Sequence, residues 1–207
     1  MSFLAFLIAL IVGVTIHEFS HAFVANLLGD KTPKIDGRLS LNPIRHMDLL
    51  GTLALFIFHI GWGKPVIIND RNFKKPIRDS ALTAIAGPIS NLATAFLIAL
   101  PLKYLSFGAN FDWLLEILNS IFTLSIVLAV FNLIPLPPFD GSKILALFIP
   151  SRYQYQYQEF MQKGVVYVLL LLLFDAYVLK AIFHGSLISR FISLVYDFIA
   201  TFIYTNT

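Results

Sequence analysis

The stretch Thr15-Ile-His-Glu-Phe-Ser-His-Ala22 lies within an apolar run that extends from Phe3 to Leu28. On a helix, residues four positions apart share one face, so the imidazoles of His17 and His21 can reach a single metal ion. Glu18 projects from the adjacent position, where its carboxylate can take a proton from a water molecule that the metal activates. Two histidines suit zinc, whose catalytic sites usually add a third protein ligand and keep one position open.

The apolar setting of this motif favours a functional interpretation. A carboxylate between two histidines is costly inside an apolar segment, and such residues indicate a functional site by default. The alternative is a pair of interfacial histidines with a carboxylate that reaches the membrane surface. The metal-binding interpretation is preferred, because the spacing of the motif also fits a single ion.

The composition indicates an integral membrane protein. The 207 residues are 57% hydrophobic and 13% charged, and the mean hydropathy is +0.78. Soluble domains carry about 25% charged residues and 45–50% apolar residues. The chain has no cysteine, which excludes disulfides and thiolate metal ligands. Because no linker or compositional shift divides the chain, we expect a single domain over residues 1–207. We expect no nucleic-acid partner.

Apolar segments of sufficient length predict an all-α polytopic protein with about five transmembrane helices. A helix needs about 20 residues to span a bilayer. The predicted spans cover residues 3–28, 81–102, 113–134, 164–183 and 187–204. A catalytic core would then occupy about 3–149, followed by C-terminal helices over about 164–204. A signal peptide is the competing interpretation of the first run, but no basic residue precedes it and no small-residue cleavage site ends it.

The apolar segment 49–60 has only 12 residues, which is too short to cross comfortably as a helix. A turn sequence, Gly61-Trp-Gly-Lys-Pro65, and a β-branched run, Val66–Ile68, follow it. We interpret 49–60 as a re-entrant or interfacial segment, with Val66–Ile68 as a short β element. Irregular backbone at membrane depth must lie against protein or a wet cavity, which places this segment beside the metal motif.

A second group of chemical interest follows the third predicted span, in Asn132-Leu-Ile-Pro-Leu-Pro-Pro-Phe-Asp-Gly-Ser-Lys143. Its three prolines interrupt a regular helix near the membrane surface. A carboxylate at such a break needs a cationic partner, so Asp140 is a candidate third metal ligand. Alternatively, Asp140 is the N-cap of a short helix over 142–149. Two other side chains, Asp175 and His46, are rival ligands, although a hydrogen-bonded structural role is favoured for both.

The basic residues predict the orientation in the membrane. If residue 1 begins outside and 49–60 does not cross, twelve of the 15 basic residues fall on the cytoplasmic side, as expected for a membrane protein. These are Lys31, Lys34, Arg38, Arg45, Lys64, Arg71, Lys74, Lys75, Arg78, Lys143, Arg152 and Lys163. His21 lies seven residues before Leu28, roughly 10 Å from the inner end of its helix. The site is therefore expected toward the cytoplasmic side.

Three ordered motifs resemble a known family. They are His17-Glu-Phe-Ser-His21, Gly87-Pro-Ile-Ser-Asn91 and Asn132-Leu-Ile-Pro-Leu-Pro-Pro-Phe-Asp-Gly141. Together they resemble the site-2 protease family of intramembrane zinc metalloproteases, and more narrowly its small prokaryotic branch without a PDZ domain. The resemblance covers residues 10–145 well and the two C-terminal spans only loosely.

The resemblance implies a role for four residues of the motifs. It implies one zinc ion per chain, bound by His17, His21 and Asp140, and it implies that Glu18 is the general base. The expected activity is endopeptidase cleavage in or near a transmembrane segment of a membrane-protein substrate, within the lipid bilayer of the cell membrane. The alternative is a non-proteolytic zinc-binding membrane protein, such as a metal carrier or an inactive partner. Glu18 argues against that alternative, because a carrier needs ligands but no general base.

Two further positions match polar residues near the family's active site. Asn91 and Asn132 are therefore candidates for holding the substrate backbone or the oxyanion. The chain departs from the family pattern at Phe139, where leucine is frequent. It also carries the metal motif in its first span, so substrate entry is expected to differ from that in longer members.

Overall fold

The computed structural model describes residues 1–48, 51, 53, 63–105, 109–183 and 185–206. Within this part of the chain, five helical stretches are long and apolar enough to cross a membrane. Their helices are α1 (Phe3–Leu28), α4 (Pro76–Tyr104), α5 (Asp112–Asn132), α7 (Gln154–Phe174) with its continuation to Ile182, and α9 (Leu187–Asn206). The prediction of an all-α polytopic membrane protein is thereby confirmed.

Short elements connect these helices. They are α2 (Thr32–Ile35), η1 (Pro43–Arg45), η2 (Asp70–Asn72), η3 (Ala109–Phe111), α6 (Asp140–Leu145), η4 (Ala146–Phe148), η5 (Ser151–Tyr153), the π-helical turn η6 (Asp175–Leu179) and α8 (Lys180–Phe183). Helix α1 ends where the sequence predicts it, because Gly29 adopts a left-handed conformation with φ of 117°. Glycine adopts this conformation without steric cost.

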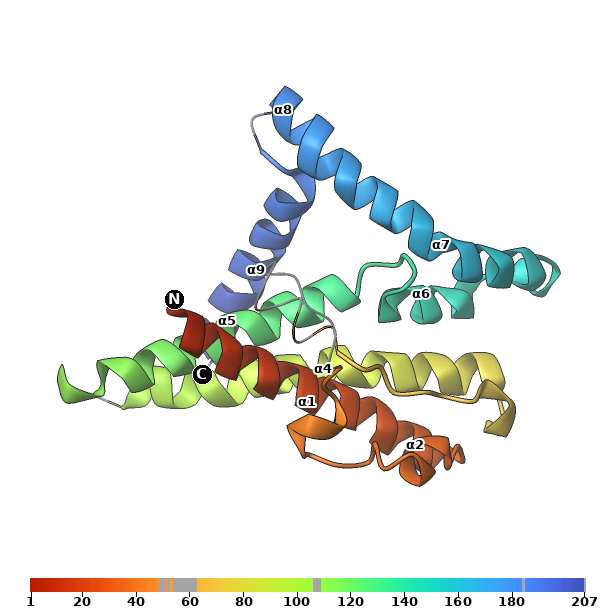
Figure 1. Cartoon of the computed structure of the whole chain (residues 1–207), viewed down its shortest axis with the longest axis horizontal. Coiled ribbons are helices and arrows are strands. Elements are labelled where there is room, and N and C mark those ends of the chain that lie inside the picture. Colours follow the sequence, from red (N-terminus) through yellow and green to blue (C-terminus); the bar gives the residue numbers. More distant parts are fainter. Residues whose placement is uncertain (49–50, 52, 54–62, 106–108, 184, 207) are drawn as a thin grey trace.

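Helices α1, α4 and α5 pack side by side in one bundle, which runs across the lower half of Figure 1. Their buried faces are rich in small residues, including Ala9 and Ala25 of α1 and Ala84 and Ala95 of α4. Apolar side chains gain nothing from leaving lipid, so membrane helices pack through small residues that let backbones approach closely. This close packing brings polar groups of α1 and α4 into contact.

Helices α7 and α9 diverge from the bundle and meet at α8, forming the two blue arms in Figure 1. The C-terminal part of α9 packs on α4 and α5 in an apolar cluster that includes Ala99, Phe122, Ile126 and Ile203. The Lys103 ammonium donates to the carbonyl of Tyr204 at 2.8 Å, so α4 and α9 end side by side. Strict alternation of five spans would put these two ends on opposite sides. Helices α1, α4 and α5 therefore run in alternating directions, whereas α9 runs in the same direction as α4.

The predicted β element is not found. Val66–Ile68 belongs to no strand, and the β-bridge that the described residues form joins Met47 to Gly63. The backbone amide of Val66 instead donates to a carboxylate on α1. Most of the predicted re-entrant segment 49–60 lies outside the described residues.

Asp30 fastens the end of α1 to the chain that leads into α4. Its buried carboxylate accepts hydrogen bonds from the amide and hydroxyl of Thr32, from the amide of Asn69 at 2.8 Å, and from Asn72 Nδ2 at 2.7 Å. Burial opposes ionisation, but the hydrogen bonds from Thr32, Asn72 and Asn69 outweigh it and lower the pKa of Asp30. The ionised carboxylate therefore stabilises the folded state.

Asp30→Asn is expected to destabilise the protein by about 1–3 kcal/mol at neutral pH, because it leaves buried donors without an acceptor. A carboxyl group with a lowered folded pKa stabilises above its unfolded pKa and loses that contribution as pH falls through the folded value. The difference in melting temperature from wild type should therefore shrink below about pH 4. Thermal unfolding in detergent measures it, with exposed Asp36→Asn as the control. Equal melting temperatures for the two variants at pH 7 would contradict this role.

Candidate metal centre

Two histidines on α1 form the centre of the site. His17 and His21 are one helical turn apart and buried, and their rings meet edge to face with centroids 4.5 Å apart. Their Nε2 atoms are 3.0 Å apart and face the same point. The four-residue spacing in the sequence produces this convergence, as predicted from helix geometry.

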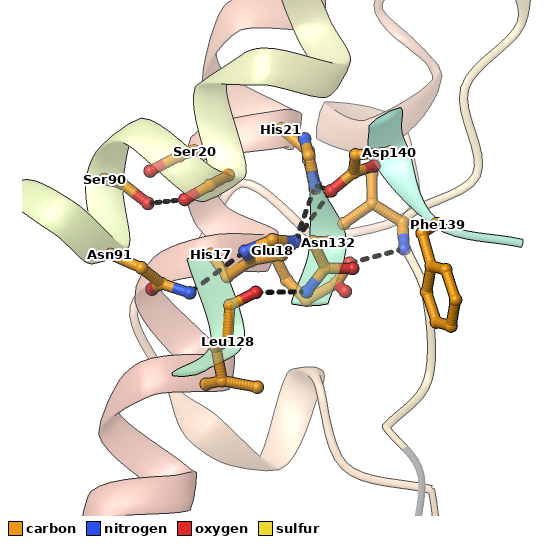
Figure 2. A network of polar contacts seen from close by, with 12 residues as sticks. His17, Glu18, Ser20, His21, Ser90, Asn91, Leu128, Asn132, Phe139 and Asp140 are labelled. Carbon is orange, nitrogen blue, oxygen red and sulfur yellow. Dashed lines mark hydrogen bonds and ion pairs between the residues drawn. The ribbon is translucent and has the colours of Figure 1, made fainter. Parts of the chain in front are cut away.

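Asp140 approaches the two histidines from a part of the chain that is distant in sequence. Helix α5 ends at Asn132, the proline-rich turn follows, and α6 begins at Asp140 without a side-chain cap bond. The carboxylate Oδ2 lies 3.1 Å from His17 Nε2 and 3.2 Å from His21 Nε2 (Figure 2). Burial opposes its ionisation, but the contacts with the two histidines hold the pKa of Asp140 well below its usual range. Asp140 thus points at the histidines and does not cap its own helix.

Gly141 allows Asp140 to approach so closely. A Cβ atom at this position would lie 2.3 Å from the carbonyl oxygen of Leu133 and 2.5 Å from that of Ile134. Real side chains do not tolerate such distances to backbone atoms. The glycine after the aspartate therefore lets the start of α6 lie directly against the end of α5.

The three side chains fit a metal ion in chemistry and geometry. The ligand atoms of His17, His21 and Asp140 all lie within 4.8 Å of one another, and these residues could hold a metal ion. Tetrahedral zinc with bonds of about 2.0–2.1 Å keeps its ligand atoms about 3.3 Å apart. The observed separations of 3.0–3.2 Å are slightly shorter, so small side-chain movements suffice to admit the ion.

Helix α4 covers the histidines from the opposite side. The Nδ1 of His21 lies 2.8 Å from the carbonyl oxygen of Thr83, and the Nδ1 of His17 lies 3.2 Å from Asn91 Nδ2. Between these two contacts lies Gly87, where a Cβ atom would come within 2.6 Å of both imidazole rings. Positions 83, 87 and 91 are four residues apart and so share one face of α4.

Glu18 is next to the ligands and has a backbone partner. Its Oε2 accepts a hydrogen bond of 2.8 Å from the amide of Val66, in the segment that precedes α4. The contact holds the carboxylate beside the histidine pair and shows that the chain around Val66 lies next to the site, as predicted for the residues after segment 49–60.

The remaining candidates lie elsewhere or have other partners. Asn132 stays close to the site, but its Nδ2 donates to the carbonyl of Leu128 on its own helix at 2.9 Å. His46 is buried and bonds through Nε2 to the carbonyl of Ser40 at 2.7 Å. Asp175 accepts hydrogen bonds from the hydroxyl of Ser186 and the amide of Leu187 at the start of α9. Both rivals thus have the structural contacts that the sequence analysis favoured.

Sequence reasoning missed two groups at the site, the Thr83 carbonyl and the Val66 amide. Every residue has a carbonyl and almost every residue has an amide, so neither group leaves a mark in the sequence. Thr83 precedes Gly87 by one turn, and a glycine inside a predicted span, where another helix can approach closely, was the available signal for it.

The fold is that of a polytopic membrane protein with a candidate histidine–carboxylate metal centre, and the comparisons identify its family. The model of peptidase family M50 matches residues 103–175, which include Asp140. YwhC of Bacillus subtilis is 45% identical over 149 residues, which cover 69% of this chain and 68% of YwhC. Rip2 of Mycobacterium tuberculosis is 30% identical over 171 residues, which cover 79% of this chain and 64% of Rip2.

The chain belongs to peptidase family M50, the site-2 protease family, and is a metallopeptidase. The resemblance drawn from its motifs is thereby confirmed. Both relatives bear the name "Putative zinc metalloprotease". No solved structure gives a significant match.

Proposed function

We propose that this protein is a zinc-dependent intramembrane endopeptidase that cuts a peptide bond in or near a transmembrane segment of another membrane protein. The observation that carries the proposal is the convergence of His17 Nε2, His21 Nε2 and Asp140 Oδ2 next to Glu18. Family membership and the names of the relatives support zinc as the ion. A carrier would need the three ligands but would have no use for a carboxylate beside them.

Each residue of the centre has a distinct task in this proposal. His17, His21 and Asp140 hold the ion, which when bound lowers the pKa of a water molecule and polarises the substrate carbonyl. Glu18 accepts a proton from the attacking water and returns it to the leaving amine. The Val66 amide keeps the Glu18 carboxylate oriented through its 2.8 Å hydrogen bond.

The substrate must unwind locally before cleavage. A peptide bond inside a helix is shielded by its own hydrogen bonds, and the centre lies within the bundle of α1, α4 and α5. We infer that the protein prefers transmembrane segments with helix-breaking residues, because their backbone groups are already free of the helical ladder.

The direct test uses purified protein in liposomes with two synthetic transmembrane peptides carrying a fluorophore. One peptide has a central Asn-Pro-Gly break, and its control has leucines at those positions. We expect cleavage of the first peptide, much slower cleavage of the second, loss of activity with 1,10-phenanthroline, and recovery on adding zinc. Cleavage that persists after complete removal of metal would refute a metal-dependent mechanism.

Ligand variants show whether the right carboxylate has been assigned. Asp140→Asn should lower zinc content and abolish cleavage, whereas Asp175→Asn and His46→Gln should bind zinc like wild type. Metal analysis after dialysis measures the content. Full zinc in Asp140→Asn with a metal-free Asp175→Asn would reverse the assignment. Stoichiometric zinc in a wild-type protein that cuts neither peptide would favour the non-proteolytic alternative.

We propose further that the protein lies in the cell membrane and that its site opens toward the cytoplasm. Eight of the 15 basic residues lie between α1 and α4, and a ninth, Arg78, lies in the first turn of α4. Three more, Lys143, Arg152 and Lys163, lie in α6, η5 and the first half of α7, whereas Lys103 lies at the opposite end of the bundle. The chain has no cysteine, so single cysteines can be introduced cleanly. Probes at Lys34→Cys and Lys74→Cys should both react from the cytoplasmic face only. Labelling from opposite faces would show that segment 49–60 crosses the membrane.

A further inference from the structure

Asn91 of α4 is completely buried, and one end of its side-chain amide has no partner. Its Nδ2 lies 3.2 Å from His17 Nδ1 (Figure 2), whereas its Oδ1 contacts no hydrogen-bond donor among the described residues. A buried carbonyl oxygen without a donor is costly, so this arrangement needs an explanation. The amide offers a donor and an acceptor of nearly the same size and shape, and either can face the histidine.

The contacts of Asn91 fix where His17 carries its proton in this arrangement. Because Nδ2 is a donor, the Nδ1 of His17 must accept, and the imidazole proton lies on Nε2. That proton can be donated to Asp140 Oδ2 at 3.1 Å or to His21 Nε2 at 3.0 Å. The arrangement is therefore consistent in the absence of metal. This tautomer of His17 cannot bind a metal through Nε2, because Nε2 must offer its lone pair to the ion.

His21 differs from His17 in this respect. Its Nδ1 faces the Thr83 carbonyl at 2.8 Å, and a carbonyl can only accept. The proton of His21 is therefore fixed on Nδ1, and its Nε2 is already free to bind metal. The partner of His21 on α4 can therefore only accept a hydrogen bond. The partner of His17 on α4 can donate or accept one, depending on which end of its amide faces the imidazole.

We propose that the Asn91 amide turns over when zinc binds, so that Oδ1 accepts a hydrogen bond from Nδ1–H of His17. This inference rests on the proposed zinc site and adds a residue that positions one of its ligands. The proton of His17 moves from Nε2 to Nδ1 by exchange with water, and Nε2 becomes the ligand atom. Asn91 is in this view a positioning residue, which replaces the expectation that it contacts the substrate backbone or the oxyanion.

Two substitutions at one position separate these roles. Asn91→Leu has a similar volume but no acceptor, and Asn91→Asp keeps an acceptor and has no amide donor. Groups that orient a metal-binding histidine typically contribute 10–100-fold to metal affinity. We expect Asn91→Leu to lower zinc affinity by about that factor and Asn91→Asp to bind zinc at least as tightly as wild type. The control is Thr94→Val on the same helix, whose hydroxyl donates to the carbonyl of Ser90.

Competition with a chromophoric chelator measures zinc affinity without any reference to cleavage. Wild-type affinity in Asn91→Leu would overturn the proposal, and combined with lost cleavage it would assign Asn91 to the substrate. Equal loss of affinity in both variants would overturn it as well. A wild-type protein without zinc affinity would instead refute the proposed function itself.

A second measurement examines the wild-type protein and does not depend on how the variants fold. Nitrogen-15 NMR of histidine-labelled protein distinguishes the two tautomers of each imidazole, and replacing the five histidines one at a time assigns the signals. We expect His17 to carry its proton on Nε2 without metal and on Nδ1 with zinc, and His21 to keep Nδ1–H in both states. A His17 that keeps Nδ1–H in both states would overturn the proposal.

Discussion

Glu18→Gln is expected to bind zinc with wild-type stoichiometry and to cleave about 10²–10⁴-fold more slowly, which is the usual contribution of a general base. Glutamine has the same size and keeps a side-chain oxygen, so it can still accept the hydrogen bond from the Val66 amide. It cannot take a proton from water at neutral pH. The substitution therefore removes the chemistry and leaves the contact with Val66 in place.

The experiment compares zinc content, thermal stability and cleavage of the Asn-Pro-Gly peptide for wild type and Glu18→Gln. Glu159→Gln is the matched control, because this residue is exposed on α7 and outside the centre. It should behave like wild type in all three measurements. Native cleavage rates in Glu18→Gln would mean that another group accepts the proton, and the proposed mechanism would then be wrong.

Gly87→Ala is expected to lower zinc affinity by at least 10–100-fold and to abolish measurable cleavage, although it adds a single methyl group. Its Cβ would lie 2.6 Å from His17 Cε1 and 2.6 Å from both Cε1 and Nε2 of His21. These atoms belong to rigid rings that backbone and side-chain partners hold on both sides. To make room, α4 must move away from α1, or the rings must leave the metal-binding position.

Gly13→Ala provides a matched control on α1. Its added Cβ would also be too close to a neighbour, at 2.7 Å, but that neighbour is the terminal Cδ1 of Leu128. A flexible leucine end can rotate away, so this variant should lose some stability, about 1–3 kcal/mol at most, and keep its zinc. Chelator competition on both variants measures the difference. Equal zinc affinity in Gly87→Ala and wild type would show that the two helices separate without disturbing the ligands.

Local rules were enough to predict much of this protein. The spacing of His17 and His21 follows from 3.6 residues per turn, and the spans follow from apolar length against bilayer thickness. The prolines after Asn132 predicted the end of α5, because proline cannot donate to the helical ladder. Each of these features depends on a few neighbouring residues and on side-chain chemistry that the sequence displays.

Contacts between distant segments were decided by the tertiary structure. Asp140 lies 123 residues from His17 in the sequence, and the packing of α6 against α4 brings its carboxylate to the histidines, whereas Asp175 bonds to the start of α9. The backbone groups at Thr83 and Val66 carry no sequence signature, so their contacts with His21 and Glu18 could not be foreseen. The β element predicted at Val66–Ile68 failed for the same reason, because the amide of Val66 bonds to a carboxylate and not to a strand.

The sequence by itself determined the helices, their membrane character and the chemistry of the histidine motif, since these depend on local periodicity and composition. The tertiary structure decided how closely Asp140 approaches the two histidines and which groups of α4 contact the two imidazoles. Hydrogen bonds act over about 3 Å, and only the close packing of α1, α4 and α6 brings groups from three parts of the chain within that distance.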